Sequence, residues 1–308
     1  MAAPKRQYQT ALDIQRQLLT KIAEDNSVNK VKSLYERAQA ELEAKLRRIP
    51  GRKDTFSAYQ QTLLLAQTKQ GQMLVAKKMA GELGDLSKQA QVASLKGLIK
   101  QVDQTEKLYT GAAPVLPIEE ASRFWGVIDK RRTSLLKAHD TSMMRYGRGV
   151  VGTVEQQLAL SLATGETTDQ AIDRIQGVAD AKWYQAERIV RTEQAWAYNA
   201  THADGVKSIS TDIPDMMMRW TEHVTDFGQP LDNRVGQDSI VLHGQVAPAG
   251  GMFTMPPDPR VSASMWGESW AHPPNRPNDR AVLTAWRPSW GGLAWMFQGK
   301  SRQVLSRA

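Results

Sequence analysis

The sequence has 308 residues, of which 41% are hydrophobic and 23% charged, a composition typical of a folded protein rather than a disordered one. Its formal net charge is +8, and it contains no cysteine, which excludes disulfides and cysteine-based zinc sites. No apolar run approaches the roughly 20 residues of a membrane-spanning helix, and the first residues lack the apolar core of a signal peptide. We therefore expect no membrane partner and a protein that folds in the cytoplasm.

The charge is unevenly distributed along the chain. Residues 1–110 hold 19 Lys and Arg against 11 Asp and Glu, whereas residues 111–308 hold 21 of each. All nine tryptophans follow Phe124. This asymmetry, with a length that suits about two domains, predicts a basic helical region over 1–113, a helical part over 118–205, and a Trp- and Pro-rich part over 206–308.

The N-terminal third has the pattern of long helices. Between Pro4 and Pro114 the only proline is Pro50, and good helix formers dominate. Apolar residues recur at helical spacing over 12–23, 31–46 and 59–102, with an expected break at Pro50 and a possible one at Gly81 and Gly84. These stripes need a partner, either each other or another chain. The last two stripes are Val31, Leu34, Tyr35, Ala38, Leu42 and Leu46, then Tyr59, Leu63, Leu64, Gln67, Leu74, Leu83, Leu86, Ala90, Leu95, Leu98 and Val102.

The middle of the chain predicts helices separated by glycines. Residues 111–117 read as a linker, and a helical pattern then runs to the cluster of Gly147, Gly149 and Gly152. Thr167 to Asp169 supplies an N-cap for a short helix over 169–176, and a separate helix is expected over 182–204.

The last third has a different texture. Ten of the fourteen prolines fall between Pro214 and Pro288, and short alternating runs over 216–224 and 239–246 predict strands joined by long loops. The expected fold class is therefore α+β, with long N-terminal helices followed by a mixed helical and short-stranded, loop-rich C-terminal domain.

A polar helix precedes the expected strands. Glu187 and Arg191 are one turn apart and can pair, while Arg188, Thr192, Ala195 and Asn199 share a face. This face either organises the following loops through hydrogen bonds or is an ordinary solvated helix surface.

Catalytic and metal-binding patterns are weak. Asp226, Asp232 and Asp238 lie six residues apart, which does not meet the spacing of a calcium loop, and the five histidines are scattered. No nucleophile elbow or phosphate-binding glycine motif occurs. An ADP-ribosyltransferase would need a Glu-x-Glu loop, but only Glu222 and Glu268 follow residue 193. We expect no cofactor, no metal and no enzyme activity.

The order of the segments over residues 150–288 resembles the Mu F-like family of phage head morphogenesis proteins. Residues 158–168 are similar to its helix ending in glycine, and 188–193 with 197–199 to its Arg-Thr-Glu helix. Trp220, Asp226, 232–234 and 242–246 stand where the family has Trp, Asp-x-Arg and Leu-Asp-Gly elements. Residues 253–259, 272–275 and 278–281 occupy the end of the pattern.

The resemblance implies a polar scaffold and an aromatic core. Asp279 and Ala281 stand at the family's cysteine positions and Ser239 near its histidine, so a Cys/His metal clasp is impossible here and packing with hydrogen bonds must suffice. The implied polar scaffold is Arg188, Arg191, Glu193, Asn199, Asp226 and Arg234, and the implied aromatic core is Trp196, Trp220, Phe253 and Trp286.

The resemblance also implies a function. We expect a structural minor capsid protein of a tailed phage or prophage, found in the head interior of the virion and in the host cytoplasm during assembly. It would aid head assembly and genome packaging or delivery. Its expected partners are the portal protein, possibly scaffold or major capsid protein, and packaged DNA through non-specific contact. The alternatives are a phage-delivered enzyme of transferase type and a basic DNA-binding protein.

Overall fold

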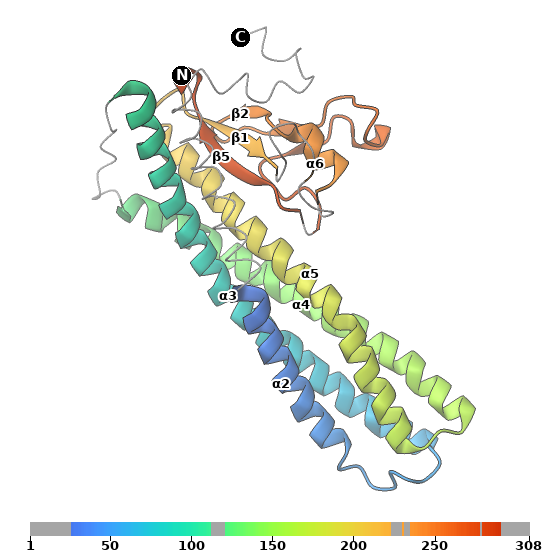
Figure 1. Ribbon diagram of the computed structural model, residues 1–308. Coiled ribbons are helices and arrows are strands. Elements are labelled where there is room, and N and C mark those ends of the chain that lie inside the picture. Colours follow the sequence, from blue (N-terminus) through green and yellow to red (C-terminus); the bar gives the residue numbers. More distant parts are fainter. Residues whose placement is uncertain (1–25, 112–120, 223–229, 231–234, 278, 291–308) are drawn as a thin grey trace. The chain divides into compact units, whose positions relative to one another are not determined.

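The computed structural model describes residues 26–111, 121–222, 230, 235–277 and 279–290 (Figure 1). The fold is α+β, with long helices first and short antiparallel strands after them. The helices are α2 (Asn29–Leu46), α3 (Ala58–Thr110), α4 (Ala121–Thr164), α5 (Thr168–Ile209) and α6 (Gln237–Leu242). The strands are β1 (Met217–Thr221), β2 (Val246–Pro248), β3 (Phe253–Thr254), β4 (Ser269–Trp270) and β5 (Val282–Trp286), with 3-10 turns η3 (Ala263–Met265) and η4 (Pro288–Trp290).

The chain forms two compact units. The helical unit comprises residues 24–86 and 133–191, and the sheet unit comprises 87–132 with 192 onward. Helices α3, α4 and α5 each contribute residues to both units. Of the three expected segments, 1–113 and 118–205 therefore contribute to both units, while 206–308 belongs to the sheet unit.

The helical unit buries apolar stripes of its own four helices against one another. The predicted stripe of α2 is confirmed, since Val31, Tyr35, Ala38, Leu42 and Leu46 are all buried. The α3 stripe is wrong at two positions, because Tyr59 is 77% exposed and Leu74 is 48% exposed.

Hydrogen bonds between side chains add specificity to this packing. Gln39 and Gln72 exchange two amide hydrogen bonds of 3.1 Å, and the Tyr35 hydroxyl donates to the Ala179 carbonyl at 2.7 Å. Such directed bonds fix the register of the helices, which apolar contacts leave free to slide.

Several predicted helix breaks are absent. Helix α3 runs through Gly81 and Gly84, α4 runs through the cluster at 147–152, and α5 joins the two helices expected over 169–176 and 182–204. A glycine inside a helix costs only about 1 kcal/mol, which tertiary packing readily offsets. At Gly147 an added Cβ would lie 3.0 Å from the Ala76 Cβ, so this glycine allows two helices to approach closely.

Two predicted helix boundaries are confirmed. Helix α2 ends at Leu46, just before Pro50. At the start of α5, the Thr167 backbone N–H donates to the Gln170 side chain at 2.8 Å, and the Gln170 N–H donates back to the Thr167 hydroxyl at 3.3 Å. This reciprocal pair is a capping box, and it satisfies two amide groups that the first helical turn leaves open.

The sheet unit is built on a three-stranded antiparallel sheet in the order β2-β1-β5. Strand β1 confirms the run predicted over 216–224 at residues 217–221, while 223 and 224 lie outside the described residues. It pairs along its length with β5, from Met217 opposite Trp286 to Thr221 opposite Val282. The strand predicted over 239–246 is wrong in its first part, which forms α6. There Ser239 and Leu242 are buried one helical turn apart, and the Ile-Val-Leu run that follows Ser239 fits either structure.

One core joins this sheet to the helices of the same unit. Trp220 packs edge-on against Phe253 with ring centroids 5.4 Å apart, and apolar residues of α3 and α5 cover them. A Cβ at Gly205 would lie 2.6 Å from a Leu98 methyl group, so a larger residue there would require that leucine side chain to shift. Within the part of the chain that the structure describes, no helix is long and apolar enough to cross a membrane.

Candidate functional site

Strand β5 is an edge strand whose outer side is closed by two side-chain amides. Asn199 of α5 donates to the Ala281 carbonyl at 3.0 Å and accepts from the Leu283 N–H at 2.9 Å. Gln101 of α3 donates to the Ala285 carbonyl at 3.0 Å and accepts from the Ala285 N–H at 3.2 Å. The two amides, which we call the amide clamp, occupy the positions that a fourth strand would fill.

The amide clamp is a buried feature. Asn199 is wholly buried and Gln101 is 2% exposed. A buried backbone group without a partner costs about 1–3 kcal/mol, so the four bonds remove a large penalty at this edge. They also tie β5 to both helices behind the sheet.

The other residues of the implied polar scaffold lie in different surroundings. Arg191 pairs with Glu187 on the same helix at 2.6 Å, Arg188 is exposed, and Glu193 is half-buried. The helix face expected to hold both Arg188 and Asn199 is therefore exposed at Arg188 and buried at Asn199. Asp226 and Arg234 lie outside the described residues.

Three of the four residues of the implied aromatic core are buried. Trp220 and Phe253 lie at the centre of the sheet unit, and Trp286 ends β5. Trp196 is half-buried in a polar contact instead. The Arg131 guanidinium lies 5.7 Å from its ring centroid, and the ring of His272 packs edge-on at 5.3 Å.

Asp204 fixes the position of Arg131 beside the Trp196 ring. Arg131 forms a two-pronged ion pair with that carboxylate, one hydrogen bond of which measures 2.9 Å. The bidentate geometry fixes the guanidinium plane, so Arg131 joins α4 to α5 and to the loop at His272.

Ser239 and Asp279, which the resemblance places at or near a metal clasp, lie in a hydrogen-bonded cluster. Ser239 accepts from the Trp220 indole at 3.4 Å and donates to Asp279 at 3.1 Å. Arg276 contacts both Asp279 at 3.6 Å and Asp238 at 3.1 Å. We call Ser239, Asp238, Arg276 and Asp279 the Asp279 cluster.

The Asp279 cluster has the chemistry of a structural network. Burial raises the pKa of Asp279, and the nearby Arg276 opposes this effect. Ser239 is wholly buried, and its oxygen both accepts and donates a hydrogen bond within the protein. No group of three or more His, Asp or Glu residues suited to a metal ion occurs among the described residues.

A second anchor for the end of β5 was missed by sequence reasoning. Glu106 of α3 is buried and accepts from the Trp290 indole at 2.7 Å and from Arg287 at 2.5 Å. Arg287 also pairs with Asp215 at 2.6 Å. The available signal was that Gln101 and Glu106 continue the apolar face of α3, where a polar residue needs a partner.

His202 is a buried ionisable group inside the sheet unit. Its ring stacks on Tyr198 with centroids 6.3 Å apart, and burial lowers its pKa from 6.5 to about 3. The ring is therefore neutral at physiological pH.

No protein-family model matches this chain, and neither does any curated protein or solved structure.

The amide clamp predicts a specific stability loss. Replacing Asn199 by Ala leaves the Ala281 carbonyl and Leu283 N–H buried without a partner, so the free energy of unfolding should fall by roughly 2–4 kcal/mol. Asn199→Asp should be similarly costly, because a carboxylate can accept from Leu283 but cannot donate to Ala281.

Urea denaturation monitored by tryptophan fluorescence measures both variants. Gln104→Ala, an exposed amide on α3, is the control and should change stability by less than about 0.5 kcal/mol. An Asn199→Ala protein as stable as this control would contradict the clamp.

His202 predicts a pH dependence with a defined sign. The unfolded chain binds a proton at this residue below pH about 6.5, whereas the folded chain stays neutral until about pH 3. The contribution of His202 to the free energy of unfolding is therefore fully present above pH 6.5. It falls by about 1.4 kcal/mol per pH unit as the pH drops from there toward 3.

The matched variant is His202→Phe, which keeps a ring against Tyr198 and removes the titration. Melting temperatures at pH 7 and pH 5 should differ less in this variant than in the parent protein. The comparison between proteins is needed because burial also lowers the pKa of His272. An equal loss in both proteins would show that His202 does not titrate as described.

Proposed function

We propose that this chain is a structural minor capsid protein of a tailed phage or prophage, associated with the portal and the head interior. In this role it would aid head assembly and genome packaging or delivery. The proposal starts from the ordered set of motifs over residues 150–288 that resembles the Mu F-like family.

The observation that carries the proposal is the pair of hydrogen bonds that the Asn199 amide makes to the backbone of β5. This residue belongs to the Arg-Thr-Glu helix of the resemblance, and its amide is wholly buried against the backbone of β5. Ser239 and Asp279, which stand at clasp positions, likewise bond to each other. Asn199 and the pair of Ser239 with Asp279 thus hold elements together, which favours an assembly protein over a transferase.

Contacts with the portal, scaffold or major capsid protein would have to use surfaces other than the predicted stripe of α2. The stripe of α2 is already buried within the helical unit. Large apolar side chains that stay exposed on this unit offer such surfaces. They are Tyr59, Leu74, Leu136, Leu160 and Tyr184.

A row of lysines supports contact with packaged DNA. Lys96, Lys100 and Lys107 are exposed and fall within about 40° of one another around α3, along about 16 Å of its axis. None of the three forms an ion pair with another described residue. Unpaired cations in a row suit the phosphates of a nucleic acid, and they also favour the alternative of a basic DNA-binding protein.

The virion assignment is tested by quantitative mass spectrometry of particles purified from a producing culture, before and after genome release. We expect a few copies per portal, with loss on release if the chain is delivered with the genome. Absence from particles, with the protein free in the cytoplasm, would overturn the assignment.

The lysine row predicts a change in the salt dependence of DNA binding by the full chain. Replacing Lys96, Lys100 and Lys107 by Gln should reduce the slope of log affinity against log salt by about 3, since each phosphate contact contributes about 1. The measurement is fluorescence anisotropy with duplex DNA between about 50 and 200 mM salt.

The control carries the same change in charge elsewhere. Replacing Lys53, Lys69 and Lys77, which are exposed on the helical unit, should leave the slope nearly unchanged. Equal effects of both triple variants would indicate that only net charge matters, and binding that is insensitive to salt would contradict phosphate contact altogether.

A further inference from the structure

A groove of about 420 Å³ lies between α2 and α3 in the helical unit, and we call it the α2–α3 groove. Its lining combines apolar and cationic side chains, and Leu74 is 48% exposed there. The lining residues of α2 and of the turn after it fall within 38–48, and those of α3 fall within 67–78. At 1.5 Å per residue, each wall of the groove is about 15 Å long.

The α2–α3 groove carries an excess of positive charge. Lys45 and Arg48 form no ion pair with another described residue. Lys78 pairs at 3.4 Å with Glu41, which is the single carboxylate in the lining. The groove therefore suits a surface that presents carboxylates beside apolar atoms.

A ridge with this chemistry runs along α5 of the same unit. Asp173, Gly177, Asp180 and Tyr184 are all exposed, and their spacing places them on one face of the helix. We call these four residues the α5 ridge. It is about 16 Å long, which matches the length of the α2–α3 groove. Gly177 keeps the ridge narrow between the two carboxylates, as a helix that enters a groove requires.

The side chains of the α5 ridge can contact a partner. Asp180 forms no ion pair with any residue that the structure describes. Asp173 contacts Arg47 at 2.8 Å, but its side chain remains 63% exposed, so this pair contributes little. Tyr184 is 63% exposed and supplies an aromatic ring, a group that is enriched in protein interfaces.

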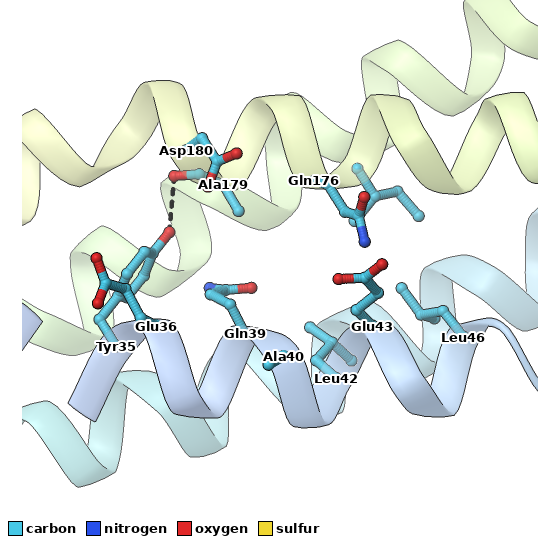
Figure 2. Close-up of a pocket in the computed structure, with 11 residues that line it drawn as sticks. Tyr35, Glu36, Gln39, Ala40, Leu42, Glu43, Leu46, Gln176, Ala179 and Asp180 are labelled. Carbon is cyan, nitrogen blue, oxygen red and sulfur yellow. Dashed lines mark hydrogen bonds between the residues drawn. The ribbon is translucent and has the colours of Figure 1, made fainter. Parts of the chain in front are cut away.

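The α5 ridge and the α2–α3 groove flank α2 on its two sides. On one side, the Tyr35 hydroxyl of α2 donates to the Ala179 carbonyl of α5, and Asp180 lies next to Ala179 (Figure 2). On the other side, Leu42 of α2 packs on Gly71 of α3, where an added Cβ would lie 2.5 Å from a Leu42 methyl group. Two copies that face each other across a two-fold axis can therefore each place the ridge in the groove of the partner.

The heights of the charges along α2 agree with this arrangement. Because Asp173 contacts Arg47, the Asp173 end of the ridge lies level with Lys45 and Arg48. Rotation about a two-fold axis parallel to α2 leaves these heights unchanged. The Asp173 end of one copy thus meets the cationic end of the groove in the other.

We propose that the α5 ridge of one copy docks in the α2–α3 groove of a second copy, and that two such contacts form a two-fold dimer. The ridge carboxylates would pair with Lys45, Arg48 and Lys78, and Tyr184 would pack against Leu74. A second copy is the favoured occupant because the chain itself carries a surface with the charge, the length and the apolar content that the groove requires. This inference does not depend on the proposed capsid function.

Sedimentation equilibrium of the full chain tests the proposal. The parent protein should dimerise reversibly, and more weakly as the salt concentration rises. Lys45→Glu with Arg48→Glu should weaken dimerisation roughly 30-fold, since each of four exposed ion pairs contributes a factor of about two to three. Asp173→Lys with Asp180→Lys should have the same effect. Leu74→Gln should also weaken dimerisation, although it changes no charge.

A mixture of the two charge-reversed variants separates complementary contact from a general effect of charge. One variant is acidic on both contact surfaces and the other is basic on both, so a one-to-one dimer should form from proteins that do not dimerise alone. Its formation also shows that both variants are folded. The control Lys137→Glu with Arg148→Glu, at exposed positions on α4, has the net charge of the acidic variant and should dimerise as the parent does.

A parent protein that stays monomeric would overturn the proposal, as would equal dimerisation of the parent, the control and the charge-reversed variants. A mixture that forms no dimer, although each variant melts at the temperature of the parent, would overturn it as well. If a charge-reversed variant does not fold, Leu74→Gln decides, because dimerisation equal to that of the parent would exclude the groove from the interface.

Discussion

The sheet unit depends on the hydrogen bonds that two helices make to the open edge of β5. Asn199 and Gln101 satisfy backbone groups that a three-stranded sheet would otherwise leave buried without partners. Because the bonds are directional, they fix both the register of β5 and the position of the helices behind it. The core around Trp220 can then close over a strand that has only one strand neighbour.

In both units, hydrogen bonds between polar groups fix the relative positions of helices and strands, which apolar packing alone leaves undetermined. In the helical unit, Gln39 and Gln72 exchange amide bonds between α2 and α3. In the sheet unit, Glu106 binds Arg287 just after β5. Ser239 of α6 donates to Asp279, which lies just before β5. Such networks are costly if half satisfied, so they favour one arrangement over its alternatives.

This distribution of polar groups bears on function. Many buried polar residues hold strands and helices together, whereas Lys96, Lys100 and Lys107 on the surface of α3 form no ion pair with another described residue.

The sequence alone determined the α+β class, the helices on either side of Pro50, the N-cap within 167–169 and strand β1, because these follow from local periodicity and turn chemistry. It did not determine that α4 and α5 continue through glycines, or that residues 237–242 are helical, because packing offsets small local propensities. Asn199 could be singled out from its motif, but Gln101, the other residue of the amide clamp, could not. Their meeting at one strand edge joins residues far apart in the chain, and only tertiary structure brings such residues together.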